Sequence, residues 1–277
     1  MAQTGKYDTF CALHERPGAF VIPNAWDAGT ARILTAMGYE ALATTSAGLA
    51  FALGKRDSAA ALTRDEVLAN ARAIAEATPL PVSADLENCF GRTPDECAQT
   101  IRMAAEFGLS GGSIEDASGD GAKPIFEFSH AVERAAGACE AAHSAGLLLT
   151  ARADNFLYGR PDLDDTIRRL QAFAAAGADV LYAPGLRDLE AIRAVCAAVS
   201  KPVNVVMGLS GPAFSVAQLR EAGVKRISVG GSFARAALGA FMRAAQEVKD
   251  HGTFTYAADA LPDAKAASYM RTSSDRS

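Results

Sequence analysis

Residues 79–91 read Pro79-Leu80-Pro81-Val82-Ser83-Ala84-Asp85-Leu86-Glu87-Asn88-Cys89-Phe90-Gly91. The stretch begins as a short uncharged run that predicts a buried strand, and two carboxylates, Asp85 and Glu87, follow where that strand should end. Neighbouring carboxylates repel each other and are costly to bury unless a cation lies between them. Mg²⁺ prefers oxygen ligands and often takes only one or two protein carboxylates. A strand end with two hydrated acids is the alternative on this stretch alone.

The pattern of a short apolar run, a loop and an Ala- and Leu-rich helical stretch recurs along the chain. Continuous apolar runs are typical of parallel strands covered on both faces. Eight such units predict an α/β fold, the (β/α)8 TIM barrel. An open doubly wound sheet is less favoured because no Gly-x-Gly-x-x-Gly follows the first run. The predicted strands are 19–23, 41–46, 81–87, 111–116, 147–154, 179–184, 202–207 and 226–230.

Helix boundaries carry their own signals. Capping residues predict helix starts at Thr63, at Thr93 with Pro94 in the first turn, and at Asp162. Glycines between a helix and the next strand predict left-handed C-caps at Gly38, Gly108, Gly146, Gly177 and Gly223.

The length of 277 residues fits one barrel. We expect a helical segment over 1–17, packed outside the main fold, and the catalytic barrel over 18–252. The composition turns polar after Gly252, so residues 253–277 are expected to form a mobile arm or a contact with another subunit.

The composition argues against several function classes. A net charge of -5 gives no electrostatic reason to expect nucleic-acid or membrane-surface binding. No apolar stretch is long enough to span a bilayer, and no secretory signal is evident. The five cysteines include no C-x-x-C pair, which favours a reduced, cytoplasmic protein; they are Cys11, Cys89, Cys97, Cys139 and Cys196.

Polar groups follow the predicted strands at their carboxyl ends, where TIM barrels place their active sites. In chain order they are Asn24, Asp27, Thr45, Ser46, Gly48, Asp57, Asp85, Glu87, Glu115, Asp116, Arg152, Asp154 and Asn204. The opposite ends carry Lys201, Lys225 and Arg226, which we expect to be ordinary surface charges.

Four of these acids, Asp57, Asp85, Glu87 and Glu115, are therefore candidates to converge on one metal ion, some of them through water. Arg152 is expected to stand opposite as a fork for a substrate carboxylate or phosphonate. Its alternative role is a structural ion pair with one of the acids.

Other chemistries fit less well. No predicted strand carries a lysine at its carboxyl end for a Schiff base, although Lys55 and Lys123 lie in loops. The histidines show no zinc-ligand spacing and are expected on surfaces or helices; they are His14, His130, His143 and His251. Gly230-Gly231-Ser232 resembles a phosphate cup, but two glycines also serve close packing.

These motifs together resemble the isocitrate lyase/phosphoenolpyruvate mutase superfamily over about residues 18–250. The metal motif of that superfamily, two acids one residue apart and a loop ending in aromatic-Gly, corresponds to residues 85–91. Here Glu87 fills the second acid position, and Cys89 stands where a glycine is usual. The other matching segments are 23–27, 45–48, 54–58, 114–116, 151–154, 184–186 and 202–205.

The resemblance implies a Mg²⁺-dependent enzyme, with Mn²⁺ as a substitute, that binds a small 2-oxo acid or dicarboxylate. Such enzymes cleave or form C–C or P–C bonds next to a carbonyl and stabilise a pyruvate-type enolate. The implied catalytic residues are Arg152, Asp57 and Glu115. The implied substrate-binding residues are Thr45, Ser46, Ala47, Gly48, Asp85, Arg152 and Asn204.

One difference from the superfamily pattern narrows the range of expected reactions. The lyases of the superfamily carry a Lys-Lys-Cys-Gly-His-type loop after the fourth strand, whereas residues 117–124 contain no cysteine or histidine. This excludes isocitrate or methylisocitrate cleavage from the expectation and favours a phosphonomutase or oxaloacetate decarboxylase-like branch. Lys123 is the candidate replacement for a mutase lysine, and Gly119 and Gly121 predict a flexible lid. Cys89 is expected to be a small buried thiol.

The reaction stays open at this point. An oxaloacetate decarboxylase-like activity is preferred over a phosphonopyruvate mutase or hydrolase, a phosphate-dependent aldolase or isomerase, and a non-catalytic 2-oxo acid binding barrel. The resemblance also implies a homo-oligomer, a dimer or tetramer. The Ala-rich stretch 233–248 suits either exchange of the last helix between subunits or cover of its own barrel.

Overall fold

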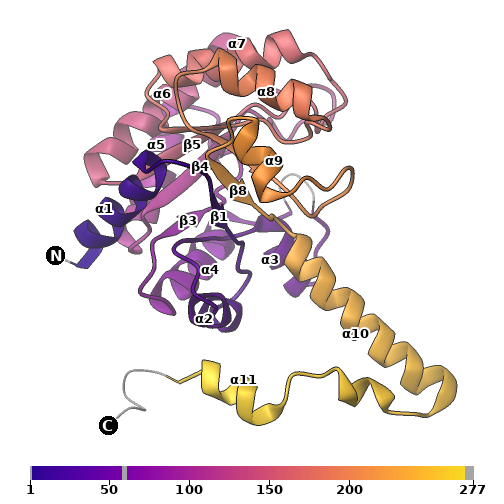
Figure 1. Cartoon of the computed structure of the whole chain (residues 1–277). Helices are drawn as coiled ribbons and strands as arrows, with labels where there is room; N and C mark the ends of the chain where they lie inside the picture. Colours follow the sequence, from indigo (N-terminus) through magenta and orange to yellow (C-terminus); the bar gives the residue numbers. More distant parts are fainter. Residues whose placement is uncertain (1, 58–60, 272–277) are drawn as a thin grey trace.

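The computed structural model describes residues 2–57 and 61–271, and helices alternate with strands along the chain (Figure 1). The strands are β1 (Phe20–Ile22), β2 (Leu42–Ala43), β3 (Val82–Ala84), β4 (Gly111–Glu115), β5 (Leu148–Arg152), β6 (Val180–Tyr182), β7 (Val203–Val206) and β8 (Arg226–Ser228). The helices are α1 (Ala2–Glu15), α2 (Ala28–Ala36), α3 (Ser46–Ala52), α4 (Arg64–Glu76), α5 (Pro94–Glu106), α6 (Phe128–Ala145), α7 (Leu163–Ala175), α8 (Leu189–Ala198), α9 (Val216–Glu221), α10 (Ser232–His251), the 3₁₀ helix η1 (Thr255–Ala258) and α11 (Asp263–Tyr269).

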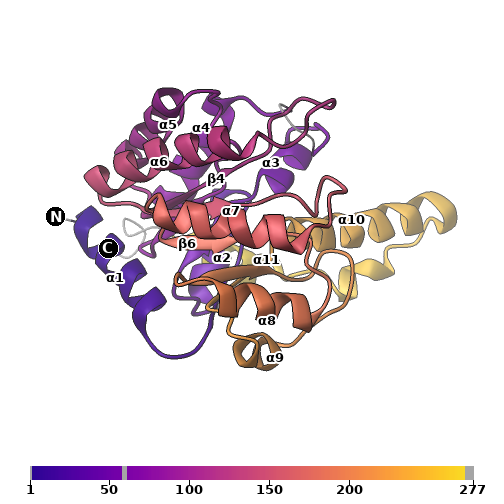
Figure 2. The same ribbon diagram turned by 90° about the horizontal axis from the view of Figure 1, so that it is seen from above.

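The strands form one parallel sheet in the order β1-β8-β7-β6-β5-β4-β3-β2. A parallel bridge between Asn24 and Ala43 joins the two edge strands, so the sheet closes on itself. Seen from above, α4 to α9 lie around the strands, whereas α10 extends away from them (Figure 2). The predicted (β/α)8 TIM barrel is confirmed, and each predicted run contains one strand.

The helix starts are also where the sequence predicted them. Thr63 and Thr93 form capping boxes with the glutamates three residues later, and the Asp162 carboxylate accepts from the Asp165 N–H. The predicted C-cap glycines all have φ between 68° and 111°. This left-handed conformation is sterically open to glycine, which lets each helix turn sharply into the next strand.

Helix α1 closes the amino-terminal end of the barrel. Its Phe10 is fully buried in a cluster with side chains of β1, β5 and the β2 entry; the cluster is Phe10, Leu13, Phe20, Ile22, Ala41 and Leu148. Gly111 makes room for it, because a Cβ there would lie 2.7 Å from Phe10 Cε1. The expectation that this segment packs outside the main fold is therefore wrong, since its apolar face completes the core below the strands.

His14 belongs to this closure; it lies in a helix, which is one of the two expected positions, but it is buried rather than on the surface. Only 9% of the residue is exposed, and the ring makes edge contacts with Phe10 and Phe20. The ring Nδ1 lies 2.8 Å from the Phe10 carbonyl oxygen, and because that oxygen can only accept, Nδ1 carries the proton. Burial, reinforced by the nearby positive charge of Arg226, lowers the pKa of His14 to about 3. The folded protein thus holds His14 neutral.

This neutral histidine predicts a pH dependence of stability. The unfolded chain takes up a proton at His14 near pH 6.5, whereas the folded chain does so only near pH 3, so stability falls as the pH drops below 6.5. Between pH 7 and pH 5, we expect the unfolding free energy of the wild type to fall by about 2 kcal/mol more than that of His14→Gln. Urea unfolding of both proteins at the two pH values measures this, and equal losses would contradict it.

The carboxyl-terminal part of the chain leaves the barrel along α10 and then returns to the side of the barrel at α2. Only Ala234 of α10 is buried, and the helix projects from the barrel (Figure 1). The chain then comes back beside α2, where the Arg32 guanidinium donates to the carbonyls of Met270 and Arg271. The predicted boundaries of the catalytic barrel, at 17/18 and 252/253, stay a prediction. Met1 and residues 272–277 lie outside the described residues. Within the described part, no helix is both long and apolar enough to cross a bilayer.

Candidate active site

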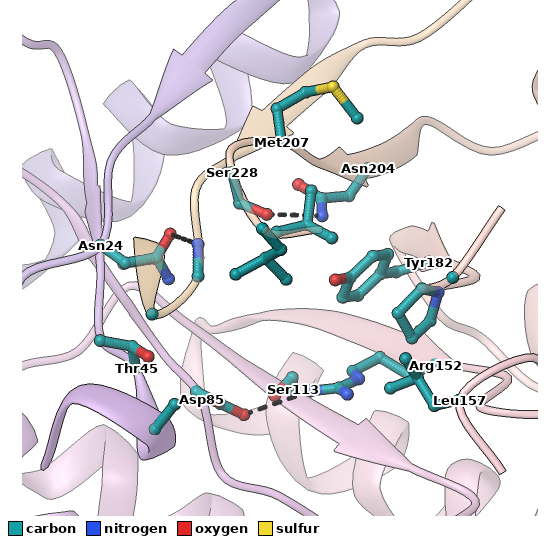
Figure 3. A pocket seen from close by; sticks show the side chains of 18 of the residues that line it. Asn24, Thr45, Asp85, Ser113, Arg152, Leu157, Tyr182, Asn204, Met207 and Ser228 are labelled. Carbon is teal, nitrogen blue, oxygen red and sulfur yellow. Dashed lines mark hydrogen bonds and ion pairs between the residues drawn. The ribbon is translucent and has the colours of Figure 1, made fainter. Parts of the chain in front are cut away.

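A pocket of about 600 Å³ opens at the carboxyl ends of the strands (Figure 3). It brings together most of the predicted site residues, namely Thr45, Ser46, Ala47, Asp57, Asp85, Glu87, Glu115, Arg152 and Asn204. Gly48 is not among the lining residues. It packs behind the loop, where a Cβ would lie 2.7 Å from Thr45 Cγ2 and 2.8 Å from Trp26 Cβ. Ser58 of the matching segment 54–58 lies outside the described residues.

Arg152 is the centre of the charged groups in this pocket. Its Nη1 lies 3.0 Å from Glu115 Oε2 and 3.4 Å from Asp85 Oδ1. A two-pronged contact with Asp154, at 3.2 Å from Nε and 3.0 Å from Nη2, fixes the plane of the guanidinium. Both expected roles of Arg152 are therefore compatible with its position, because it pairs with the acids and still lines the pocket.

The acids around Arg152 carry more negative charge than this one cation balances. Burial, with the charges of Asp85 and Asp57, raises the pKa of Glu87 to about 7. The pKa of Asp57 is raised by burial and by Asp85, and burial raises the pKa of Glu115 despite the attraction of Arg152. Shifts of this direction mean that the site favours an additional positive charge.

The donors suit Mg²⁺ bound largely by water and substrate. Among residues 2–57 and 61–271, no three acidic, histidine or cysteine side chains converge closely enough to hold an ion directly. The four predicted carboxylates thus line one pocket without forming a closed cage. Asp85 Oδ2 accepts from the N–H and hydroxyl of Ser46, which orients the carboxylate. One or two such oriented carboxylates meet the ordinary requirement of Mg²⁺.

The loop that follows Asp85 has an unusual backbone. Glu87, Cys89 and Phe90 have φ of 49°, 58° and 53°, although none of them is glycine. The conformation costs free energy and persists only where surrounding contacts enforce it. Cys89 is fully buried, as expected for a packed thiol, and burial raises its pKa well above the ordinary value.

Arg134 of α6 provides these contacts. The side chain is 1% exposed, and its guanidinium donates to the backbone carbonyls of Asn88, Gly91 and Glu115. It also stacks on the Phe126 ring with 4.1 Å between Cζ and the ring centroid. One buried side chain therefore ties the loop after β3 to the end of β4.

We expect Arg134→Met to lower the unfolding free energy by about 3 kcal/mol, because it leaves one buried and two partly buried carbonyl oxygens without their donor. Urea denaturation measures the loss. Arg102→Met, on the exposed face of α5, serves as the control and should change stability by less than about 0.5 kcal/mol. A loss for Arg134→Met as small as that of the control would contradict this role.

Two predicted rim acids do not enter the pocket. The Asp27 carboxylate caps α2 by accepting from the Thr30 N–H at 2.7 Å. Asp116 points toward the helices, where its carboxylate accepts from Arg169 Nη1 at 3.1 Å and from the Asp154 N–H at 2.8 Å. Each of them is a strand-end acid that the backbone turns away from the barrel axis.

The remaining candidates are accounted for by packing. Lys55 pairs with Glu66 at 2.5 Å, and neither Lys55 nor Lys123 lines the pocket. In the predicted phosphate cup, the Gly230 N–H donates to Asn24 Oδ1, and the Ser232 N–H donates to the Val229 carbonyl oxygen. Those amides are consequently not available to a phosphate.

The interior of the barrel holds polar residues that sequence analysis missed. Tyr182 points its hydroxyl into the pocket beneath the mouth (Figure 3), and the wall below it is polar; it is lined by Ser83, Ser113, Thr150, Ser228 and Arg226. Arg226 is only 5% exposed, so the expectation of a surface charge is wrong. The alternation of Arg226, Ile227 and Ser228 is the signal that could have found it, because every second strand residue faces inward.

A closed parallel barrel with a polar pocket at the carboxyl ends of its strands has the architecture of the TIM-barrel enzymes. The family model described as phosphoenolpyruvate phosphomutase matches residues 10–249. The chain belongs to this family, within the isocitrate lyase/phosphoenolpyruvate mutase superfamily, whose members include lyases and mutases.

Individual relatives agree with this assignment. A candidate lyase/mutase of Burkholderia cenocepacia J2315 has a structure that is 53% identical, with a TM-score of 0.95 and 98% of each chain covered. The structure of a 2,3-dimethylmalate lyase is 26% identical with a TM-score of 0.86, covering 99% of this chain and 96% of that one. The 2-methylisocitrate lyase of Salmonella typhimurium is 28% identical over 78% of this chain and 75% of its own length.

Proposed function

We propose that this protein is a Mg²⁺-dependent enzyme that cleaves a C–C bond at the carbon next to the carbonyl of a small 2-oxo acid or dicarboxylate, as an oxaloacetate decarboxylase does. The observation that carries the proposal is the gathering of Asp85, Glu87 and Glu115 around Arg152 in one pocket. This set offers oxygen ligands to a hard cation and a fixed cation to a substrate anion.

Asp85 and Glu87 are the proposed ligands, with Glu115 and Asp57 reached through water. When bound, Mg²⁺ supplies positive charge that stabilises the oxygen of a pyruvate-type enolate. Arg152 donates to the same oxygen from the opposite side, and Asp154 holds its guanidinium in that orientation. A preorganised donor of this kind lowers a barrier by about 3 to 4 kcal/mol. The loop of Thr45, Ser46 and Ala47 borders the place for the substrate carboxylate.

The proposed reaction needs no protein acid for the bond-breaking step. For oxaloacetate, the electron pair of the C3–C4 bond forms the C2–C3 double bond of the enolate, the 2-oxo oxygen becomes the oxyanion, and the C4 carboxylate leaves as CO₂. The enolate carbon then takes a proton from water to give the 2-oxo acid product. Residues 117–124 are consistent with such a reaction, because they contain no cysteine or histidine that could act as the acid/base residue of the lyases.

A phosphonopyruvate mutase or hydrolase is the second candidate, supported by the match to the phosphoenolpyruvate phosphomutase model. It is less favoured because Lys123, the only lysine of the 117–124 loop, is exposed and does not line the pocket.

Oxalate, which mimics the enolate, tests the site directly. We expect Mg²⁺-dependent binding of oxalate by isothermal titration, abolished by excess EDTA and weakened at least tenfold by Asp85→Ala, because the ion loses an oriented ligand. Asp27→Ala, which removes a carboxylate on the same rim outside the pocket, is the matched control and should bind normally.

Oxalate binding that ignores both EDTA and Asp85 would contradict the enolate mechanism. A screen of oxaloacetate and phosphonopyruvate then separates the two candidate reactions by product: CO₂ release supports the decarboxylase, and phosphate release or rearrangement supports the second candidate. Mg²⁺-dependent binding without turnover of either substrate would support a binding barrel.

We further propose that the protein is a homo-oligomer assembled through α10. This helix carries large apolar side chains in solvent, with Phe241 70% and Met242 68% exposed. The same segment exposes Leu238 and, beyond the helix, Phe254 and Leu261. Exposed large apolar side chains concentrated on one segment in this way are characteristic of a protein interface.

The double substitution Phe241→Asp and Met242→Asp is expected to reduce the oligomer to a smaller species, because it places two charges in the proposed interface. Light scattering after gel filtration measures the mass. Lys249→Asp, a polar position on the same helix, should leave the mass of the wild type unchanged. A monomeric wild type would contradict the proposal.

A further inference from the structure

Tyr182 is the last residue of β6 and lies beside Arg152 in the sheet. The register pairs the Cα atoms of the two residues across β5 and β6. The Arg152 Cζ lies 5.2 Å from the centroid of the Tyr182 ring, within the range of a cation–π contact. Both side chains line the pocket, and the Tyr182 hydroxyl points into it (Figure 3). A substrate held by Arg152 therefore lies next to this hydroxyl.

The Tyr182 hydroxyl has no task within the protein. In the part of the chain that the structure describes, it forms no hydrogen bond, whereas the Ser46 hydroxyl of the same pocket donates to Asp85. Burial raises the pKa of Tyr182 although the charge of Arg152 favours the tyrosinate, so the phenol carries its proton at neutral pH. The pocket thus contains a protonated donor that is left to a ligand.

Few other groups of the pocket can give a proton to carbon. General acids in enzymes are mostly histidine, carboxylic acids, lysine, tyrosine and cysteine. The pocket lining, taken over residues 2–57 and 61–271, includes no histidine, lysine or cysteine. Its carboxylates contact Arg152 or are the proposed metal ligands. Two phenols remain, and Tyr158 lies in the loop beyond β5 with 37% of the residue exposed. Tyr182 is the donor that lies beside Arg152.

The proposed reaction requires such a donor after the C–C bond has broken. Departure of CO₂ leaves an enolate whose oxygen lies at Arg152. Its C3 atom must take up a proton before the 2-oxo acid is formed. Because the enolate is planar, a donor that is fixed on one side protonates one face only.

We propose that Tyr182 is a catalytic residue that delivers this proton to C3. The Tyr182 O–H bond breaks, the electron pair of the C2–C3 double bond forms the new C–H bond, and the C2 oxyanion becomes a carbonyl. The tyrosinate then takes a proton from water, and the remaining hydroxide combines with CO₂ to give bicarbonate. The proton still comes from water but passes through Tyr182. This inference rests on the proposed function and adds the residue that completes its second step.

A purely structural role of Tyr182 would reside in its ring, which stacks on Arg152. Tyr182→Phe keeps that ring and removes only the hydroxyl. The variant is expected to fold, because no hydrogen bond within the described residues is lost. If the role is structural, the variant behaves as wild type. If the hydroxyl delivers the proton, the variant loses control over the face of the enolate that is protonated.

The experiment is the decarboxylation of 3-methyloxaloacetate in D₂O with Mg²⁺, which places deuterium at C3 of 2-oxobutanoate. Oxidation of this product to propionate and NMR with a chiral reagent give the ratio of the two C3 configurations. We expect wild type to favour one configuration by about tenfold or more, and Tyr182→Phe to give the two within about twofold. Tyr158→Phe, which removes the other phenol of the lining, is the matched control and should keep the wild-type ratio.

Two further readouts of Tyr182→Phe separate proton delivery from support of the site. The variant should still release CO₂, because bond breaking needs no proton donor. It should also bind oxalate with Mg²⁺ within about twofold of wild type, since oxalate has no carbon to be protonated. Loss of CO₂ release or of oxalate binding would overturn the proposal, because the hydroxyl would then support the whole site.

The proposal is also overturned if Tyr182→Phe keeps the wild-type preference, or if wild type gives both configurations equally. Should the methyl group prevent turnover, oxaloacetate with deuterium at C3 in tritiated water allows the same comparison through the configuration of the pyruvate methyl group. A wild type that releases no CO₂ from either substrate counts against the proposed function itself, and the inference falls with it.

Discussion

The constraint on which the site depends is the repulsion among carboxylates at the barrel mouth. Asp85, Glu115 and Asp154 all contact Arg152, and Glu87 adds a further acid whose pKa is raised by burial and by the charges of Asp85 and Asp57. One arginine does not balance this set. The fold tolerates the imbalance because the surrounding barrel is rigid: strands in parallel register carry these side chains, and they cannot move apart.

Three buried arginines and the partly buried Arg152 show how the same side chain is used for different purposes. Arg152 pairs with carboxylates at the mouth, and Arg169 pairs with Asp116 and Asp165 between the barrel and its helices. Arg134 donates to backbone carbonyls and thereby holds a loop with left-handed residues. Arg226 has neutral side-chain partners alone among the four.

The barrel itself could be predicted from the sequence because eight apolar runs and their caps repeat with little ambiguity. The residues of the barrel mouth could then be predicted as well, since the fold places the carboxyl end of every strand on one rim. The positions of Asp27 and Asp116 could not be predicted, because a turn of one residue decides whether a strand-end acid faces the axis or a helix. Arg226 and Tyr182 were missed for a related reason: their inward direction depends on register, which a single run of residues does not reveal.

The closure of the barrel floor has a consequence for how the chain reaches its native state. His14 and Arg226 are 212 residues apart in the sequence, and Phe10 packs against residues of both β1 and β5. Helix α1 precedes all eight strands in the sequence, but its partners exist only once the last strand has been made. Pairing across such a distance carries a large loop-closure entropy. The segment that seals the floor is thus synthesised before the strands that it contacts and is among the last to acquire all its contacts.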